Sequence, residues 1–206
     1  MARQNRVTPL GEIIADPARG LLMGNRGILH DDDGKMGHRT YRHRAWITCV
    51  LAFKNRRHPL AAPGRYTPLF FLDEAVAFAA GHRPCAECRR ADYLRFRAAF
   101  AAGDGDQPGA VEIDRRLHAA RVRPRVGTKV TFDAPIADLP DGSFIVTDTG
   151  AMLLWQDRML PYRPAGYGAP LARPATGSVT VLTPAPVVEA FRNGYLPATH
   201  PTAKTI

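Results

Sequence analysis

Apolar residues along this chain follow two patterns, and each pattern predicts a different kind of element. Residues 46–53 are rich in β-branched and aromatic side chains and lie between basic loops, which predicts a β-strand. In residues 86–102, Tyr93, Phe96 and Phe100 recur at the spacing of helical turns, which predicts a helix with an aromatic face. Together the two patterns indicate a chain that mixes helices and strands.

Residue types at element ends predict where other elements begin and stop. Asp73 is a type that caps helix N-termini and Gly81 is a type that follows helix C-termini, so a helix is predicted at residues 73–80. Residues 1–30 are predicted to be a short structured lead-in, with a turn at 24–27 followed by the start of a strand. The other predicted elements are a turn at residues 54–57, strands at 65–71, 129–132, 143–147, 151–155 and 178–182, and helices at 112–121 and 186–193.

A change of pattern divides the chain. Residues 103–109 read Gly-Asp-Gly-Asp-Gln-Pro-Gly, a polar, glycine-rich run typical of linkers, and strands and turns dominate after residue 127. We therefore predict an α+β fold in three parts: a first module at residues 1–103, a linker at 104–111, and a helix followed by a β-rich region at 112–206.

The composition adds a bias toward anionic partners. The 206 residues are 45% hydrophobic, which is enough for a core, and they carry a net charge of +9 with a pI of about 10. Much of this charge is arginine in the first half, and arginine suits bidentate contacts with phosphate. DNA or RNA is therefore the predicted partner, and a basic but inert surface is the alternative.

The sequence also bears on location. No apolar run is long enough to span a membrane, and the N-terminal Met-Ala-Arg-Gln-Asn-Arg lacks the apolar core of a signal peptide. Three cysteines, two of them in a Cys-x-x-Cys, fit a reducing compartment better than a disulfide framework. We expect a cytoplasmic protein with no membrane partner.

The strongest chemical motif is Pro84-Cys85-Ala-Glu-Cys88, which precedes the basic helix. Two thiols at this spacing match the paired ligands of zinc knuckles, and Cys49 on the strand predicted at 46–53 supplies a third thiolate. Thiolates favour Zn²⁺, so we predict a zinc site with these three ligands and a fourth. The alternatives are a metal-free thiol pair or a redox pair, although a redox pair usually follows a strand in a βαβ unit.

The fourth ligand is sought among the histidines. His30 ends a short apolar segment that can pair beside the Cys49 strand, and it is the favoured candidate. His43 lies about 20 Å from Cys49 along an extended strand, so it can serve only if the chain bends. His82 would crowd the knuckle around Pro84, and His58 can lie across the hairpin but is expected nearer Ala52 than Cys49.

An open fourth position would change the chemistry. Three thiolates and a water form a catalytic zinc site, and Glu87, between the two knuckle cysteines, is then the nearest general base. Zinc deaminases place a glutamate beside a zinc-ligating histidine, and this chain has no such His-x-Glu pair. Serine-hydrolase, P-loop and dinucleotide motifs are also missing from the sequence.

The stretch from Cys49 to Arg90 resembles the metal-binding domain of the Ada alkylation-repair family. The shared pattern is a helix, a glycine, a ring residue and Arg-Pro-Cys-x-x-Cys-Arg, and it covers about a fifth of the chain. The resemblance implies four zinc ligands, association with DNA, and a strand cysteine that accepts a methyl group from a DNA phosphotriester. The residues that match are Glu74, Ala75, Gly81, His82, Arg83, Pro84, Cys85, Cys88 and Arg89.

Cys49 is the residue that matches the reactive strand cysteine. The family usually has a second strand ligand four positions away, where this chain has Ala45 or Phe53. Ile47 and Leu51 share the face of Cys49 on the predicted strand, which would direct the sulfur into a packed interior. We therefore expect Cys49 to be a structural ligand and not a methyl acceptor.

Two further groups of residues suggest chemistry less strongly. Asp114 and His118 are one turn apart on a predicted helix, which suits an acid–base pair but is more typical of a helix surface. Trp155, Tyr162 and Tyr167 are interleaved with arginines, which suits stacking on unpaired bases but is more typical of core packing.

The leading hypothesis is a zinc-binding protein that contacts nucleic acid, in DNA repair or processing. The second is a zinc-dependent hydrolase or deaminase with an open metal position, and the third is a zinc-stapled protein-interaction module. The predicted phosphate contacts are Arg83, Arg89, Arg90 and Arg97.

Overall fold

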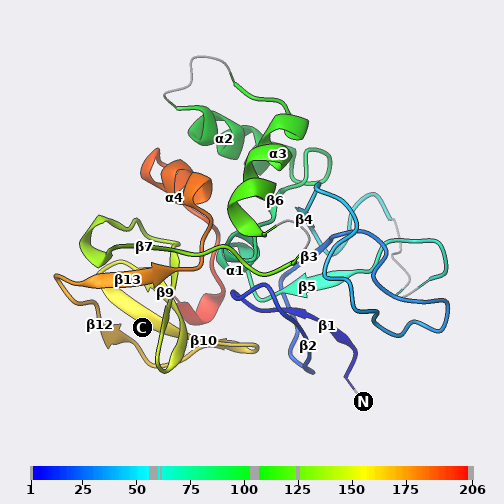
Figure 1. Ribbon diagram of the computed structural model, residues 1–206, viewed down its shortest axis with the longest axis horizontal. Coiled ribbons are helices and arrows are strands. Elements are labelled where there is room, and N and C mark those ends of the chain that lie inside the picture. The colour runs from blue at the N-terminus through cyan, green and yellow to red at the C-terminus, as the bar shows by residue number, and fades with distance from the viewer. Residues whose placement is uncertain (1, 56–59, 61, 103–106, 124–125, 204–206) are drawn as a thin grey trace.

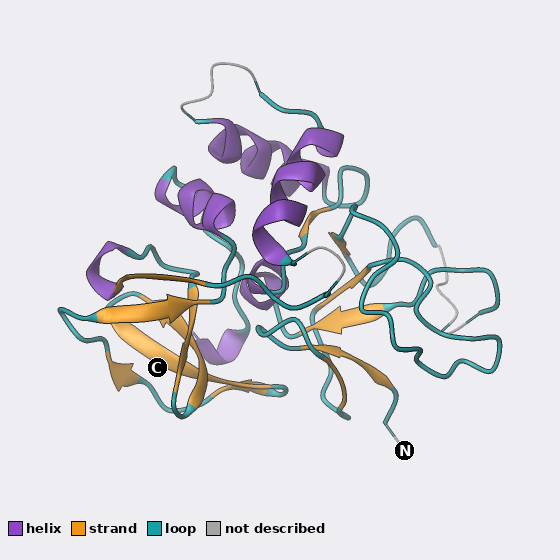
Figure 2. Ribbon diagram, in the orientation of Figure 1, coloured by secondary structure: helices purple, strands orange, loops and turns teal. Residues whose placement is uncertain are grey.

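The computed structural model describes residues 2–55, 60, 62–102, 107–123 and 126–203. Two β-sheets lie side by side, and three of the helices are grouped above them (Figure 1). The same view coloured by secondary structure separates the two sheets clearly (Figure 2). The predicted α+β class is confirmed. Within the described ranges, no helix combines the length and apolar character needed to cross a membrane.

The first sheet is built almost entirely from the N-terminal part of the chain. Its strands in the described residues follow the order β2-β1-β5-β3-β4-β6, with β1/β5 and β4/β6 parallel and the other pairs antiparallel. The strands are β1 (Gln4–Val7), β2 (Ile13–Ala15), β3 (Leu22–Asn25), β4 (Ile47–Cys49), β5 (Leu69–Phe71) and β6 (Arg83–Pro84).

Residues 1–30 are structured as predicted, but they form part of the first sheet and do not precede it. This segment supplies three strands, and the turn predicted at 24–27 is confirmed only in its second half: Gly24 pairs with Thr48 inside β3, and the chain bends at residues 26–27, where Gly27 has a φ of 103°. A Cβ on Gly24 would lie 2.2 Å from the Ile47 carbonyl oxygen, so Gly24, unlike Gly27, allows close strand approach and does not form a turn. β4 is also shorter than the predicted strand at 46–53.

The second sheet is antiparallel throughout. Its described strands follow the order β11-β10-β9-β8-β13-β7, and β12 pairs with β10. The predicted strands at 143–147, 151–155 and 178–182 are confirmed with small shifts, whereas β10 was not predicted. The strands are β7 (Phe132–Pro135), β8 (Phe144–Thr147), β9 (Gly150–Trp155), β10 (Arg158–Arg163), β11 (Gly166–Tyr167), β12 (Leu171–Ala172) and β13 (Ser178–Val181).

Helix α1 (Glu74–Ala79) occupies the centre of the molecule (Figure 1). Asp73 caps it as predicted, accepting a hydrogen bond from the Val76 N–H at 2.9 Å, and Gly81 follows it with a φ of 88°. All six residues of α1 are buried. A helix that is apolar nearly all round belongs in a core, which is where α1 lies.

The remaining helices are α2 (Arg90–Ala101), α3 (Ala110–Arg121) and α4 (Ala185–Arg192). The predicted aromatic face of α2 is confirmed, because Tyr93, Phe96 and Phe100 are buried in a cluster with residues of α3 and α4. A second cluster includes Phe71 from the first sheet and Leu153 from the second, so both sheets contribute to one core around α1.

Candidate metal centre

Two short parallel strands bring Cys85 beside Cys49. β4 ends at Cys49, and β6 runs beside it with Thr48 opposite Pro84. The Cys85 N–H extends this ladder by donating to the Thr48 carbonyl oxygen at 2.9 Å. Strand pairing, and not proximity in sequence, therefore positions these two thiols.

A tight turn then places Cys88 against the other two cysteines. The Glu87 N–H donates to the Cys85 sulfur at 3.4 Å, and the Val50 N–H donates to the Cys88 sulfur. The Sγ atoms of Cys49, Cys85 and Cys88, which we call the thiol cluster, all lie within 4.8 Å of one another. Zn–S bonds of about 2.3 Å at tetrahedral angles require S–S distances of roughly 3.8 Å. The thiol cluster can therefore hold a metal ion, and its three cysteines are reduced and partly exposed.

The thiol cluster would accumulate negative charge if more than one of its thiols ionised, and a bound cation would stabilise that charge. The hydrogen bond that the Cys49 thiol donates to Cys85 raises the pKa of Cys49 and lowers the pKa of Cys85 to about 5. Burial raises the pKa of Cys88, and negative charge on Cys85 raises it further. One thiolate thus forms readily and repels the next, whereas a divalent ion would offset that repulsion and let all three ionise.

The structure does not bring His30 into the thiol cluster. Its Nδ1 lies 2.6 Å from the Thr67 hydroxyl and its Nε2 lies 3.3 Å from the Ala62 carbonyl oxygen, so both ring nitrogens have partners elsewhere. Among the described residues, the group of close metal-ligating side chains that contains Cys49 comprises the three cysteines and no histidine.

The other candidate histidines are not part of the thiol cluster, or they lie outside the residues that the structure describes. His82 is fully buried, with its ring 4.6 Å from that of Phe71, and its Nε2 accepts a hydrogen bond from Arg26. His43 is exposed in a loop, and His58 is outside the described residues. Tyr66, which sequence reasoning missed, lies near the thiols: burial raises its pKa, and negative charge on the cysteines raises it further.

The environment of Cys49 differs from the one predicted. Leu51 lies beyond the end of β4 and is 48% exposed, and Cys49 itself is partly exposed. The argument that Ile47 and Leu51 bury the Cys49 sulfur in a packed interior was therefore wrong.

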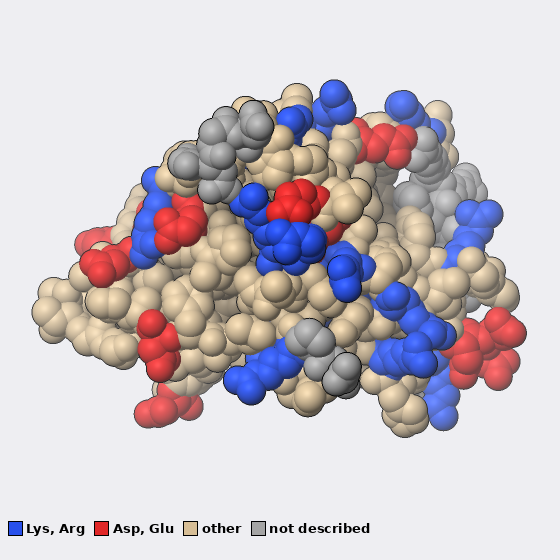
Figure 3. All heavy atoms as spheres, turned by 45° about the horizontal axis from the view of Figure 1, so that its top comes forward, with Lys and Arg blue, Asp and Glu red and all other residues tan. Residues whose placement is uncertain are grey.

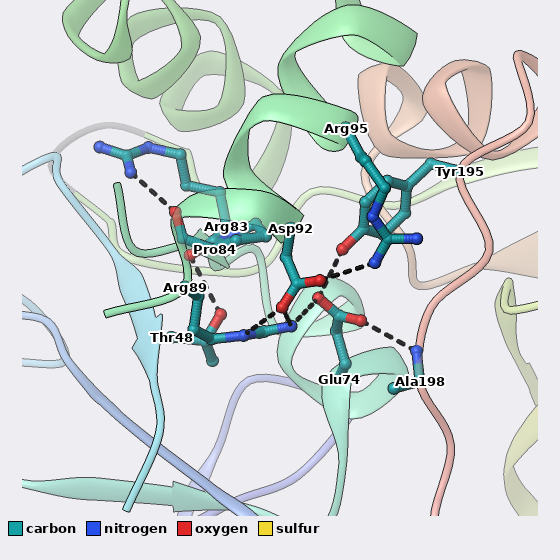
Figure 4. A network of polar contacts seen from close by, with 9 residues as sticks. All are labelled: Thr48, Glu74, Arg83, Pro84, Arg89, Asp92, Arg95, Tyr195 and Ala198. Atoms are coloured by element: carbon teal, nitrogen blue, oxygen red, sulfur yellow. Dashed lines mark hydrogen bonds and ion pairs between the residues drawn. The ribbon is translucent and has the colours of Figure 1, made fainter. Parts of the chain in front are cut away.

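Arginines on either side of the knuckle anchor it to two helices. Arg83 is buried and donates from Nε and Nη2 to the two carboxylate oxygens of Asp114 on α3, at 2.9 and 2.7 Å. Arg89 is also buried, and its Nη2 donates to Glu74 on α1 at 2.6 Å and to Asp92 at 2.8 Å (Figure 4). Both guanidinium groups are paired with carboxylates inside the protein. The basic residues of the motif had suggested phosphate contacts instead.

Glu74 extends this anchor to the C-terminal segment. Its carboxylate also accepts hydrogen bonds from the Tyr195 hydroxyl at 2.7 Å and from the Ala198 N–H at 2.9 Å (Figure 4). Asp114 is bound to Arg83, and His118 instead contacts Arg121 at 3.3 Å. The acid–base pair that their spacing suggested is therefore replaced by an ion pair that supports the knuckle.

The exposed basic groups lie elsewhere. Arg90 is exposed, and Arg97 is partly exposed with its Nη2 donating to the Gln107 carbonyl oxygen. Residues 38–44, which we call the basic loop, read His-Arg-Thr-Tyr-Arg-His-Arg and are exposed apart from the half-buried Tyr41. On the face shown in Figure 3, Lys and Arg side chains form a band from the centre to the lower right.

The aromatic residues of the second sheet serve mainly in packing. Tyr167 is buried and its hydroxyl donates to Asp73 at 2.7 Å, while Trp155 and Tyr162 pack against the core around α1. Arg173 donates to backbone carbonyl oxygens. These contacts agree with the core-packing interpretation of this segment.

Comparisons with protein-family models, curated proteins and solved structures gave no match.

Proposed function

We propose that this chain is a zinc-binding protein that contacts nucleic acid and acts in DNA repair or processing. The observation that carries the proposal is the thiol cluster, with three sulfurs within 4.8 Å of one another and backbone N–H groups directed at two of them. Thiolate ligands favour Zn²⁺ over the harder divalent ions, and three sulfurs this close together could hold one ion. Reduced thiols of this kind belong in a reducing compartment, so we place the protein in the cytoplasm.

The charge distribution supports an anionic partner. The net charge is +9, and the basic loop with Arg39 and Arg42 presents arginines to solvent. A phosphate backbone is the anion that such a surface suits, because each phosphate neutralised releases a counterion. The resemblance of the knuckle to the Ada metal-binding domain points in the same direction.

The metal part of the proposal is tested by elemental analysis and X-ray absorption of protein purified without added metal. We expect about one zinc per chain with three sulfur ligands, and loss of both metal and folding in Cys85→Ser or Cys88→Ser. Cys49→Ser measures the contribution of the strand ligand to zinc binding separately from that of the knuckle pair. A chain that folds normally and contains no zinc after careful handling would refute this part.

The nucleic-acid part is tested by fluorescence anisotropy with labelled single-stranded and duplex oligonucleotides at several salt concentrations. We expect Arg39→Gln with Arg42→Gln to weaken binding broadly and to reduce the salt slope by about one per charge removed. The matched control is Arg158→Gln with Arg163→Gln, which removes two exposed charges from the second sheet. Equal losses in the two double variants, or no binding at low salt, would refute a specific basic surface.

The coordination shell also separates this proposal from catalysis. The thiols are partly exposed and Glu87 beside them is exposed, which is the arrangement that an open metal position requires. A shell of three sulfurs and one water, together with a Glu87→Gln variant that binds zinc normally but loses an activity on a nucleic-acid substrate, would favour the zinc-dependent enzyme. A shell completed by a fourth protein ligand favours the structural role.

A further inference from the structure

A second site lies apart from the thiol cluster, in a pocket of about 380 Å³ with no cysteine among its lining residues. The residues that line it include Arg26, Trp46, Arg121 and Lys129. Arg26 and Arg121 are 1% and 2% exposed, and Trp46 lies between them with each guanidinium 4.1 Å from the ring centroid. Two arginines and a lysine thus surround one cavity.

The three cations have no carboxylate partner within ion-pairing distance in the part of the chain that the structure describes. Their hydrogen bonds go to neutral groups. Arg26 donates to the Gly11 carbonyl oxygen and His82, Arg121 to the Gly81 carbonyl oxygen, and Lys129 to that of Ala79.

Two of the buried donors stay without a hydrogen-bond partner among the described residues: Nη2 of Arg26 and Nε of Arg121. A Cβ built on Gly11, which also lines the pocket, would lie 3.9 Å from Arg26 Nη2. This nitrogen therefore lies near Gly11, just beneath the surface of the pocket. A buried charge without a counter-ion is costly, and an anion in the pocket would reduce that cost through electrostatic attraction without touching the two buried donors.

The electrostatics agree with this geometry. Burial lowers the pKa of Arg26 and of Arg121 to about 9, and it lowers the pKa of Lys129 to about 7. Burial is the largest cause of each shift; the Asp114 carboxylate opposes it at Arg121, whereas no carboxylate among the described residues opposes it at Arg26 or Lys129. Among the lining residues that the structure describes, Glu12 is the one carboxylate, and it is exposed at the rim.

We propose that this pocket binds a phosphate group, with Lys129 and the rim hydroxyls of Thr128 and Thr131 contacting its oxygens near the two buried arginines. Phosphate matches a pocket with several positive charges because it carries close to two negative charges and accepts several hydrogen bonds at once. Leu10 and Val122 line the remaining wall, so a phosphomonoester with an organic part fits better than a bare ion.

The position of the pocket indicates the source of that phosphate. Thr40 belongs both to its lining and to the basic loop, and Gly127 lines both this pocket and a second hollow that His38 and Arg39 also line. A strand that lies along the basic loop could place a terminal phosphate in the pocket. Phosphate binding itself does not depend on the proposed function, because inorganic phosphate alone can test it.

The test is isothermal titration of the full chain with inorganic phosphate, with adenosine 5′-monophosphate, and with one oligonucleotide carrying either a 5′-phosphate or a 5′-hydroxyl. We expect saturable one-to-one binding of phosphate. Stronger binding of the phosphorylated strand than of its hydroxyl counterpart identifies a strand end as the source. Equal affinity for inorganic phosphate and for the phosphorylated strand identifies the free anion.

Variants connect the binding to the pocket. Lys129→Gln keeps a donor for the Ala79 carbonyl oxygen but removes the charge, and it should weaken phosphate binding roughly 10- to 100-fold. Arg158→Gln, a charge-matched change in the second sheet, should leave it unaltered. Glu12→Gln should strengthen binding a few-fold because it removes the repelling carboxylate.

A steric variant keeps the proposal testable if Lys129→Gln does not fold. Leu10 is 38% exposed on the pocket wall, so Leu10→Trp should fill the pocket and abolish binding while the fold is kept. Leu21→Trp, at a residue 45% exposed and outside the pocket, is its control. The proposal is overturned if folded protein shows no saturable phosphate binding. It is also overturned if each pocket variant behaves like its control.

Discussion

Removal of the Asp114 carboxylate should destabilise the protein and loosen the metal knuckle together. Asp114 on α3 accepts two hydrogen bonds from Arg83, and the two side chains are 8% and 5% exposed. Arg83 lies in β6, directly before the Pro84-Cys85 step of the knuckle. Asp114→Ala leaves the guanidinium buried without a counter-charge.

The size of the effect follows from the burial of the pair. Loss of one partner of a buried ion pair costs about 3–5 kcal/mol, because the other charge stays desolvated. Arg121 adds to the cost, since burial lowers its pKa to about 9 and Asp114 is the carboxylate that opposes this shift. With an m-value of roughly 2.5 kcal/mol per M urea for a chain of this size, the unfolding midpoint should fall by about 1–2 M.

The assay is urea unfolding of zinc-loaded protein, followed by circular dichroism and by tryptophan fluorescence, with zinc affinity measured by chelator competition. The matched control is Glu112→Ala on the same helix, whose ion pairs with Arg115 and Arg116 lie at the surface. Surface pairs contribute little, so this control should unfold close to the unmodified chain. Zinc affinity should fall in Asp114→Ala and stay constant in Glu112→Ala.

A double variant separates lost pairing from lost packing. In Asp114→Ala with Arg83→Met, no buried charge is left, so stability should recover part of the loss. The reasoning is refuted if Asp114→Ala shifts the midpoint no more than Glu112→Ala does. It is also refuted if the double variant is as unstable as the sum of the two single changes.

Three further predictions concern the neighbourhood of the knuckle. Gly81→Ala should destabilise the fold by at least about 2 kcal/mol, because φ is 88° and the new Cβ would lie 2.5 Å from the Arg121 side chain. The control Gly194→Ala has a φ of 92° and open space around the new Cβ, so it should cost only the backbone strain. Equal urea midpoints for the two variants would contradict this prediction. Burial lowers the pKa of His82 well below its usual range, so the unfolded chain binds a proton below pH 6.5 that the folded chain does not, and stability should fall by up to about 1.4 kcal/mol per pH unit on acidification. Urea midpoints between pH 5 and 7 should show a smaller slope for His82→Gln, and identical slopes would argue against it. Methyl iodide or methylated DNA should not modify Cys49 selectively in the zinc-loaded protein, because the three thiols are similarly exposed; stoichiometric methylation of Cys49 alone in mass spectra would instead support methyl acceptance.

Local features of this chain were predictable because neighbouring residues determine them. Asp73 caps α1 through an N–H three residues ahead, and Gly81 takes a positive φ directly after that helix. The Cys85–Cys88 turn forms from adjacent residues, and the aromatic spacing on α2 predicts its buried face correctly. The cap, the glycine and the turn involve groups close in sequence, so the pattern itself contains the contact; for α2 the pattern indicates which face is buried but not that α3 and α4 cover it.

Only the tertiary structure decided the partners that come from distant parts of the chain. The parallel pairing of β4 with β6 brings Cys49 to the knuckle, and the N-terminal residues enter the first sheet instead of preceding it. Arg83 and Arg89 look like phosphate contacts in the sequence, but their carboxylate partners on α3 and α1 bury them. Arg26 and Lys129 meet at one pocket although neither belongs to a motif. Arg83 and Arg89 are buried because carboxylates distant in sequence reach them on folding, whereas Arg26 and Arg121 are buried against Trp46 with no carboxylate within ion-pairing distance among the described residues; no local pattern records either environment.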